Sequence, residues 1–219
     1  MKNNTNTQGK FIVISGGEGS GKTTVLEHLS RKLPQVLFTR EPGGSPYGEA
    51  IREVMLKHPH AKSAPSGAHF CLAWAGRVDH LENKIIPALG RGQHVISDRF
   101  DCCTYAYQIC AQEGSHLEDL FWIMRSTVLN PQLPHLYIHL DVDVDEGLRR
   151  VALRKGVDQN HFDDARRDFH VRIQEGYRTF FEKMLHKKNN DTKMIKINAN
   201  QPLQAVIDEC ERVVQEYLV

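Results

Sequence analysis

The chain has 219 residues, of which 40% are hydrophobic and 25% are charged, and its formal net charge is +1. This composition is typical of one globular domain, and the near-neutral charge excludes bulk attraction to nucleic acid or to an anionic membrane. The first apolar run, residues 11–14, is too short for a signal-peptide core, and no run approaches bilayer length. We therefore expect a soluble, cytoplasmic protein without nucleic-acid or membrane partners.

The cysteine pattern predicts neither a disulfide framework nor a metal site. There are five cysteines, at Cys71, Cys102, Cys103, Cys110 and Cys210. The number is odd, and no pair has the spacing of metal ligands or of a redox motif. Reduced thiols in the cytosol are the simplest interpretation.

Taken in chain order, the predicted elements alternate between strands and helices. Residues 1–10 are polar and are expected to be disordered, and residues 11–219 are expected to form a single domain. Apolar or β-branched segments predict strands at residues 11–15, 35–39, 94–97, 136–140 and 194–197. Helical patterns cover residues 22–33, about 65–89, 143–154, about 162–180 and 203–218. Alternation of this kind favours an α/β fold, a five-stranded parallel sheet flanked by helices in the P-loop NTPase arrangement.

Two polar segments, residues 57–67 and 154–164, look mobile. The second follows the fourth strand, and we interpret it as a lid.

The segment after the first strand fits the phosphate-binding pattern Gly-x4-Gly-Lys-Thr. Glycines let successive backbone N–H groups converge on phosphates, and the N-terminus of the following helix adds partial positive charge. Lys22 is placed to reach the β- and γ-phosphates, and Thr23 can offer its hydroxyl to Mg²⁺. The expected donor-binding residues are Gly16, Gly17, Glu18, Gly19, Ser20, Gly21, Lys22, Thr23 and Thr24.

A phosphate loop alone does not separate a kinase from an ATPase or GTPase, but further motifs follow the other strands. They are TREPGGSPYGEAIR at 39–52, SDRF at 97–100, AYQ at 106–108, LDVD at 140–143 and GLRR at 147–150. Together they make the chain resemble the thymidylate kinases, over nearly its whole length. The resemblance implies transfer of the γ-phosphoryl group of ATP to dTMP, with Mg²⁺, and a homodimer.

Two arginines and one aspartate follow strand ends, where open α/β sheets build sites. The rigid fork of arginine suits bidentate phosphate contacts, and the resemblance implies that Arg40 and Arg99 hold the monophosphate. Asp98, at the end of an apolar strand, is expected to order Mg²⁺ with Thr23. For each arginine, a surface salt bridge is the alternative.

The resemblance also implies roles around the acceptor sugar and base. Glu18 would lie near the 3′-hydroxyl and the phosphate-binding arginine, with a structural role in the loop as its alternative. Tyr107 would lie under the deoxyribose, although an amphipathic helix explains it equally well. Thr104 and Gln108 are candidates for contacts with the sugar or base.

The phosphate loop has Gly19 and Ser20 and therefore no arginine. The resemblance implies that in such a case arginines of the lid supply the last cation. Arg154 is the preferred candidate, next to Lys155, and a solvated helix end is its alternative. By resemblance, Arg150 stacks on the adenine and residues 198–202 line its edge.

The sequence departs from the family at the base site. The family usually has a stacking phenylalanine four residues before an arginine; here these positions are Ala73 and Arg77. Arg77 could still bond a base carbonyl. Phe70 or Trp74 could replace the ring, although Trp74 could equally be a core residue.

Two further departures concern the phosphate loop and the lid. One lid arginine is missing or replaced by His161, and Ser15 replaces a carboxylate that is common before the loop.

The favoured function is therefore phosphorylation of dTMP by ATP. Three alternatives stay open: a related deoxynucleoside monophosphate kinase with another base preference, a P-loop NTPase that couples hydrolysis to a partner, and a nucleotide-binding paralogue without turnover.

Overall fold

A computed structural model describes residues 8–130, 132–153, 162, 166–187 and 191–218. Its centre is a five-stranded parallel sheet in the order β2-β3-β1-β4-β5. The strands are β1 (Phe11–Gly16), β2 (Leu37–Arg40), β3 (Val95–Asp98), β4 (Leu136–Asp141) and β5 (Lys193–Asn198). The predicted α/β fold is confirmed, and each strand lies within two residues of its expected bounds.

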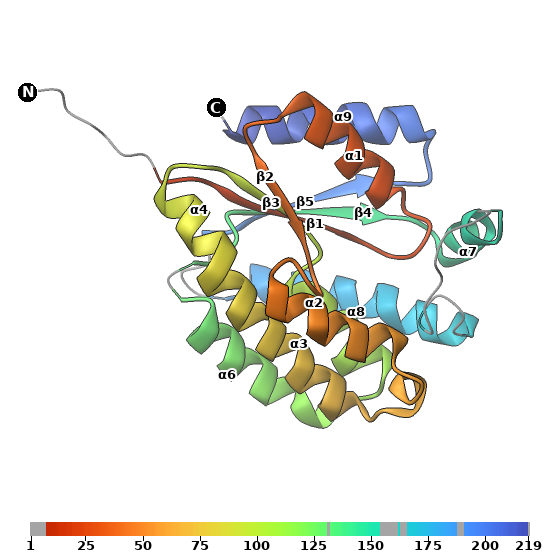
Figure 1. Cartoon of the computed structure of the whole chain (residues 1–219). Coiled ribbons are helices and arrows are strands. Elements are labelled where there is room, and N and C mark those ends of the chain that lie inside the picture. Colours follow the sequence, from red (N-terminus) through yellow and green to blue (C-terminus); the bar gives the residue numbers. More distant parts are fainter. Residues whose placement is uncertain (1–7, 131, 154–161, 163–165, 188–190, 219) are drawn as a thin grey trace, which may run out of the picture.

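Helices cover both faces of this sheet (Figure 1). Their bounds are α1 (Lys22–Lys32), α2 (Pro46–Lys57), α3 (Ser66–His80), α4 (Ile86–Gly90), α5 (Asp101–Thr104), α6 (Glu118–Val128), α7 (Val144–Ala152), α8 (Arg167–Leu185) and α9 (Leu203–Leu218). Short 3₁₀ turns are η1 (Ala61–Ser63) and η4 (Ser115–Leu117), and π-helical segments are η2 (Leu81–Ile85) and η3 (Tyr105–Ala111). Figure 1 shows α1 and α9 over one face, with α2, α3, α6 and α8 on the other side.

The alternation of side chains along β1 divides the core into two parts. Ile12 and Ile14 point toward α1 and α9, where they join a cluster with Val25 and Val206. On the opposite face of the sheet, Phe11 and Val13 pack in a second cluster, which is rich in aromatic residues from α3, α6 and α8. All six residues of β1 are buried, as expected for a central strand covered on both sides.

Strand register brings the site residues together. Ile14 on β1 is the partner of Asp98 on β3, and Arg40 on β2 is the partner of the same aspartate. Gly16 is the partner of Leu140 on β4. The phosphate loop and the segments that follow β2 and β3 therefore meet at one edge of the sheet.

The long helix predicted from residue 65 is continuous through α3, η2 and α4. Pro65 lies at its N-cap position rather than inside the first turn. A wide π-helical turn at Leu81–Ile85 precedes Pro87, which lies at the start of α4. An interior proline lacks an N–H and crowds the carbonyl four residues earlier, and a wider turn relieves that conflict.

Several predicted boundaries differ from the structure. Helices α2, α5 and α6 were not predicted, and α8 begins at Arg167, so Phe162 precedes it instead of belonging to it. Gly9, expected in a disordered segment, donates its backbone N–H to the Leu89 carbonyl at 3.0 Å. Residues 57–67 include η1 and the ends of two helices. Of the expected lid, residues 154–164, the structure describes Phe162 alone. The helix before it was expected to reach residue 154; α7 ends at Ala152, and residue 154 lies outside the described residues.

None of the helices in the described part of the chain is both long and apolar enough to cross a bilayer.

Candidate active site

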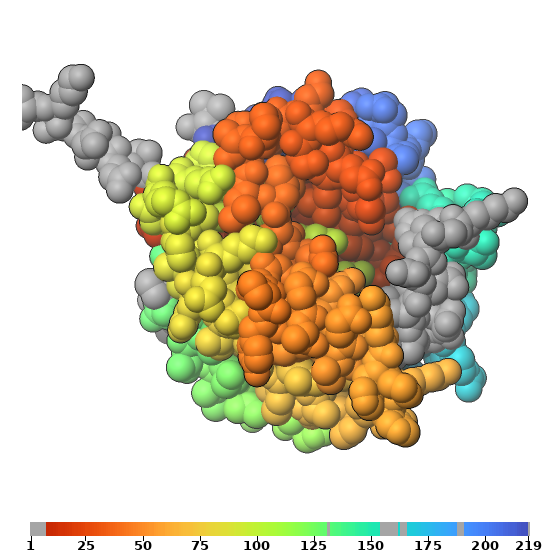
Figure 2. Space-filling view, viewed as in Figure 1, coloured from red at the N-terminus to blue at the C-terminus, as the bar shows by residue number. Residues whose placement is uncertain are grey.

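A cavity of about 270 Å³ opens at the carboxyl ends of β1, β2 and β3. Its wall includes the phosphate loop, the segments after β2 and β3, the end of α5, part of η3 and the inner sides of α2 and α3. In Figure 2 the surface is hollowed between the red segment that contains α1 and the orange segment of α2. The cavity therefore joins the expected donor loop to the expected acceptor residues.

The phosphate loop is tightly bent. Gly19 and Gly21 have φ angles of 72° and 85°, in the left-handed region that favours glycine. A Cβ at Gly19 would lie 2.2 Å from the Gly147 carbonyl oxygen, so the close approach of α7 also requires glycine. The Nζ atom of Lys22 donates to the Gly16 carbonyl at 2.9 Å, which holds this buried cation against the start of the loop.

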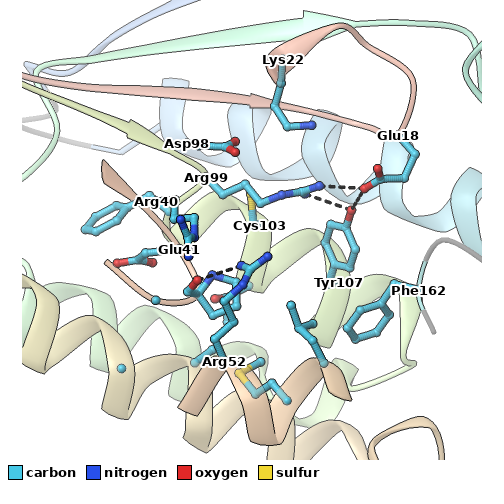
Figure 3. A pocket seen from close by; sticks show the side chains of 18 of the residues that line it. Glu18, Lys22, Arg40, Glu41, Arg52, Asp98, Arg99, Cys103, Tyr107 and Phe162 are labelled. Carbon is cyan, nitrogen blue, oxygen red and sulfur yellow. Dashed lines mark hydrogen bonds and ion pairs between the residues drawn. The ribbon is translucent and has the colours of Figure 1, made fainter. Parts of the chain in front are cut away.

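Arg99 lies at the centre of a compact ionic cluster (Figure 3). Its Nη2 donates to Glu18 Oε1 at 2.7 Å and its Nη1 to the Tyr107 hydroxyl at 3.0 Å. Tyr107 in turn donates to the same Glu18 oxygen at 3.0 Å. The backbone φ of Arg99 is 68°, a sparsely populated conformation for a non-glycine residue, which is common at functional sites. The sequence predicted each of these residues, and the structure brings all three together.

The electrostatics of this cluster keep it charged. Burial alone would raise the pKa of Glu18, but the Arg99 and Lys22 cations and the hydrogen bonds from Arg99 and Tyr107 lower it to about 2. Burial lowers the pKa of Lys22, and the neighbouring Arg99 lowers it further. Glu18 is thus ionised at neutral pH, where it orients a guanidinium that can bind phosphate.

Two more cations line the cavity from the β2 side. Arg40, which is half-exposed, donates from Nη2 to Glu49 Oε2 at 2.9 Å. Arg52 donates from Nη1 to the Pro42 carbonyl at 2.9 Å. Arg52 belongs to the motif at residues 39–52, but sequence reasoning gave it no role. Its position at the last residue of the motif, on the inner side of α2, was the available signal.

Arg77 is buried at the other end of the cavity. Its Nε and Nη2 donate to Glu41 Oε2 at 2.9 Å and 2.7 Å, and Nη2 also donates to Thr104 Oγ1 at 3.0 Å. Nη1 has no hydrogen-bond partner in the described part of the chain. Glu41 also contacts His80 Nδ1 at 3.2 Å, so this carboxylate fixes two α3 side chains. Sequence reasoning missed Glu41, although it is part of the motif.

Phe70 and Trp74, proposed as replacement stacking rings, pack in the core instead. Their exposed fractions are 1% and 2%, and their ring centroids lie 6.2 Å apart in an edge-to-face arrangement. Neither ring lines the cavity; on this side its wall is formed by Ala73 and Gly76. The helix turns these aromatic residues toward α6, where Trp74 contacts Phe121 at 5.7 Å.

Phe162, Cys103 and Gln108 also line the cavity. The ring of Phe162 lies 5.5 Å from that of Tyr107, nearly perpendicular to it. Burial raises the pKa of the Cys103 thiol, but its hydrogen bond with Cys102 and the Arg99 charge lower it to about 6. Of these three residues, sequence reasoning gave a role at this cavity to Gln108 alone.

Asp98 and Thr23 both line the cavity, as expected for a metal pair. The Asp98 side chain lies near Lys22 in Figure 3, and its Oδ1 is buried with no hydrogen-bond partner among the described residues. Those residues contain no cluster of three or more His, Cys, Asp or Glu side chains that could hold a metal by themselves. A single carboxylate with a hydroxyl fits Mg²⁺ that is bound mainly through substrate phosphates.

Arg150 connects the phosphate loop to the segment after β5. Its Nη1 donates to the carbonyls of Ala199 at 2.8 Å and Gly19 at 3.3 Å, and its Nε donates to Glu146. The remaining lid residues with expected roles, Arg154, Lys155 and His161, lie outside the described residues. Ser15, by contrast, is buried under the loop and contacts His139 Nδ1 at 3.1 Å.

Comparison with known proteins identifies the family. Residues 14–210 match the sequence model described as thymidylate kinase. A thymidylate kinase of Alkalilimnicola ehrlichii is 37% identical over 94% of this chain and 92% of its own length. A thymidylate kinase of Halalkalibacterium halodurans is 34% identical over 97% of this chain and 99% of its own length. The predicted resemblance is confirmed: the chain belongs to the thymidylate kinase family and is a phosphotransferase.

Proposed function

We propose that this protein transfers the γ-phosphoryl group of ATP to dTMP, releasing dTDP and ADP. The observation that carries the proposal is the shared cavity. Its wall contains both the triphosphate-binding loop and Arg99, a second, pre-oriented phosphate-binding cation. A hydrolase needs only the first of these two features, whereas a kinase needs both, because two phosphorylated substrates repel each other.

At the donor side, backbone N–H groups of Gly16–Thr24 and the N-terminus of α1 bind the ATP phosphates. Lys22 neutralises charge on the β- and γ-phosphates. A bond forms between an acceptor phosphate oxygen and the γ-phosphorus, while the bond from that phosphorus to the β,γ-bridging oxygen breaks. The acceptor oxygen is already ionised, so the reaction requires no general base.

At the acceptor side, Arg99, Arg40 and Arg52 hold the monophosphate. Their geometry supports this role, since all three guanidinium groups line one cavity and Arg99 is oriented by Glu18. Tyr107 covers the sugar, where its ring disfavours a ribose 2′-hydroxyl by steric exclusion.

At the base end, Arg77, Thr104 and Gln108 contact the base edge. The unpartnered Nη1 of Arg77 supports this assignment, because a buried donor costs free energy until a ligand accepts its hydrogen bond.

Mg²⁺ is the expected metal, held by Asp98 and Thr23 together with the phosphates. When bound, it neutralises the charge that builds up on the β- and γ-oxygens. The orphaned Asp98 oxygen supports this assignment.

The remaining parts of the proposal rest on the family. Arg154 supplies the lid cation, with Lys155 or His161 in place of a missing arginine. Arg150 stacks on adenine, and residues 198–202 line its edge. The protein works as a homodimer in the cytoplasm.

An acceptor panel tests the proposal. The purified protein is incubated with ATP, Mg²⁺ and each of dTMP, dUMP, dCMP, dGMP and TMP, the ribonucleotide of thymine, and ADP formation is measured. We expect dTMP to give the highest kcat/KM and TMP a much lower one. If dTMP were among the poorest acceptors, the proposed substrate would be wrong.

A further inference from the structure

The base end of the cavity is apolar and lacks large side chains on the α3 side. Met55 and Leu56 of α2, Ala73 and Gly76 of α3, and Phe162 line it beside the polar groups of Arg77, Thr104 and Gln108. Lys22, Arg40 and Arg99 line the phosphate-binding part. A ligand that fills the cavity is therefore anionic at one end, and its other end meets apolar side chains next to a few polar anchors.

Among the described residues, no aromatic side chain of α3 fills the space beside Ala73 and Gly76, because those aromatic side chains pack in the core. The aromatic residues next to Ala73 are committed to the core: Trp74 packs edge-on against Phe70 and lies 4.6 Å from the Arg77 guanidinium. They cannot turn toward the cavity without breaking those contacts. Even a Cβ at Gly76 would meet only the Ile51 side chain, at 3.6 Å or more.

Arg77 would hold a bound base next to the space beside Ala73. Ala73 precedes Arg77 by four residues, one turn of α3, so both side chains share the cavity-facing side of the helix. The buried Glu41 carboxylate fixes the Arg77 guanidinium and leaves Nη1 as an unpartnered donor. A base anchored there by a carbonyl oxygen has only a methyl side chain beside it at Ala73.

We propose that Ala73 determines specificity by admitting pyrimidine deoxynucleoside monophosphates whose base carries an apolar substituent larger than a methyl group. The inference rests on the proposed function, because it takes this cavity as the acceptor site. The same phosphoryl transfer applies to these acceptors. Each added CH₂ that becomes buried favours binding about fourfold, so the larger acceptor does not depend on new polar contacts.

The test compares dTMP with 5-(1-propynyl)-dUMP as acceptors. Values of kcat/KM are measured for the wild type, Ala73→Phe, Ala73→Val and Ala75→Phe. Ala75 lies on the same helix but is exposed and does not line the cavity, so it is the matched control for adding a phenyl ring to α3. The quantity compared between proteins is kcat/KM for the propynyl nucleotide divided by kcat/KM for dTMP.

We expect the wild type to use the propynyl nucleotide within tenfold of dTMP. Ala73→Phe should lower the ratio more than tenfold, because its ring fills the space beside Ala73 that the larger substituent would occupy. Ala73→Val should give an intermediate ratio, and Ala75→Phe should match the wild type. Activity on dTMP shows that each variant is folded. If Ala73→Phe does not fold, the ratio of Ala73→Val is compared with that of the wild type instead.

Two results would overturn the inference and leave the proposed function intact. In the first, the wild type phosphorylates dTMP but uses the propynyl nucleotide more than a hundredfold less well. In the second, the ratio is the same in the wild type and in both Ala73 variants. If the wild type phosphorylated neither nucleotide, the proposed function would fail, and the inference with it.

Discussion

The ion pair between Glu18 and Arg99 makes a quantitative prediction for Glu18→Gln. Glutamine mimics the protonated carboxyl group, so the substitution removes the charge without removing the side chain. Glu18 is largely buried, with 16% of its side chain exposed, and Arg99 is its direct partner at 2.7 Å. The variant should therefore lose most of the stabilisation that the carboxylate provides.

The pKa gives the size of that loss. Glu18 has a pKa of about 2 in the folded protein, against an ordinary value of 4.5. Since one pKa unit corresponds to about 1.4 kcal/mol, ionisation of Glu18 stabilises the folded state by about 3 kcal/mol at pH 7. A lowered carboxyl pKa gives stability that is complete above pH 4.5 and is lost as the pH falls toward 2. At pH 3 the contribution is about 1 kcal/mol.

Urea unfolding of the wild type and Glu18→Gln at pH 7 and pH 3 measures both values. We expect the difference in unfolding free energy between the two proteins to fall by more than half at the lower pH. Glu53→Gln is a suitable control, because Glu53 forms an exposed pair with Lys57, whose contribution should be below about 1 kcal/mol. A Glu18→Gln difference that stays constant between the two pH values would refute the electrostatic reasoning.

Three further predictions concern catalysis and reactivity. Asp98→Asn should lower kcat and raise the Mg²⁺ concentration needed for half-maximal rate, whereas an unchanged Mg²⁺ dependence would remove Asp98 from the metal site. Arg154→Ala should lower kcat more than ATP affinity, and unchanged turnover would contradict its role as lid cation. Cys103, with its pKa of about 6, should react with iodoacetamide at a rate that rises up to about pH 7 and then levels off, more slowly when dTMP is bound; peptide mass spectrometry locates the label. A rate on Cys103 that keeps rising beyond pH 8, as for an ordinary thiol, would show that the Arg99 charge does not activate it, and Cys102→Ser tests the contribution of its neighbour.

Local patterns predicted the sheet and the glycine-rich loop between β1 and α1 well. Short apolar runs mark buried strands, and the glycine-rich loop has a spacing that few other structures require. These signals depend on neighbours in sequence, so one chain is enough to find them. Helices α2 and α6 were missed, because most residues of α2 were interpreted only as part of a motif and the helical periodicity of α6 was not used.

Contacts between distant residues could not be predicted in the same way. The pairing of Arg77 with Glu41 joins residues 36 positions apart, and nothing local to either residue indicates it. Helical spacing placed Trp74 and Ala73 about 100° apart but did not say which of them faces the core. The packing of α3 against α6 decides that question, and it makes the small residue the one beside the cavity.

The most direct test of the account is the fate of the γ-phosphoryl group. ATP labelled with ³²P at the γ-position is incubated with the protein and Mg²⁺, with and without dTMP, and the products are separated by chromatography. We predict that the label moves to dTDP in equal amount to the ADP formed, with little free phosphate in either sample. Release of labelled phosphate at the same rate with and without dTMP, and no labelled dTDP, would contradict the assignment of the cavity as a two-substrate kinase site.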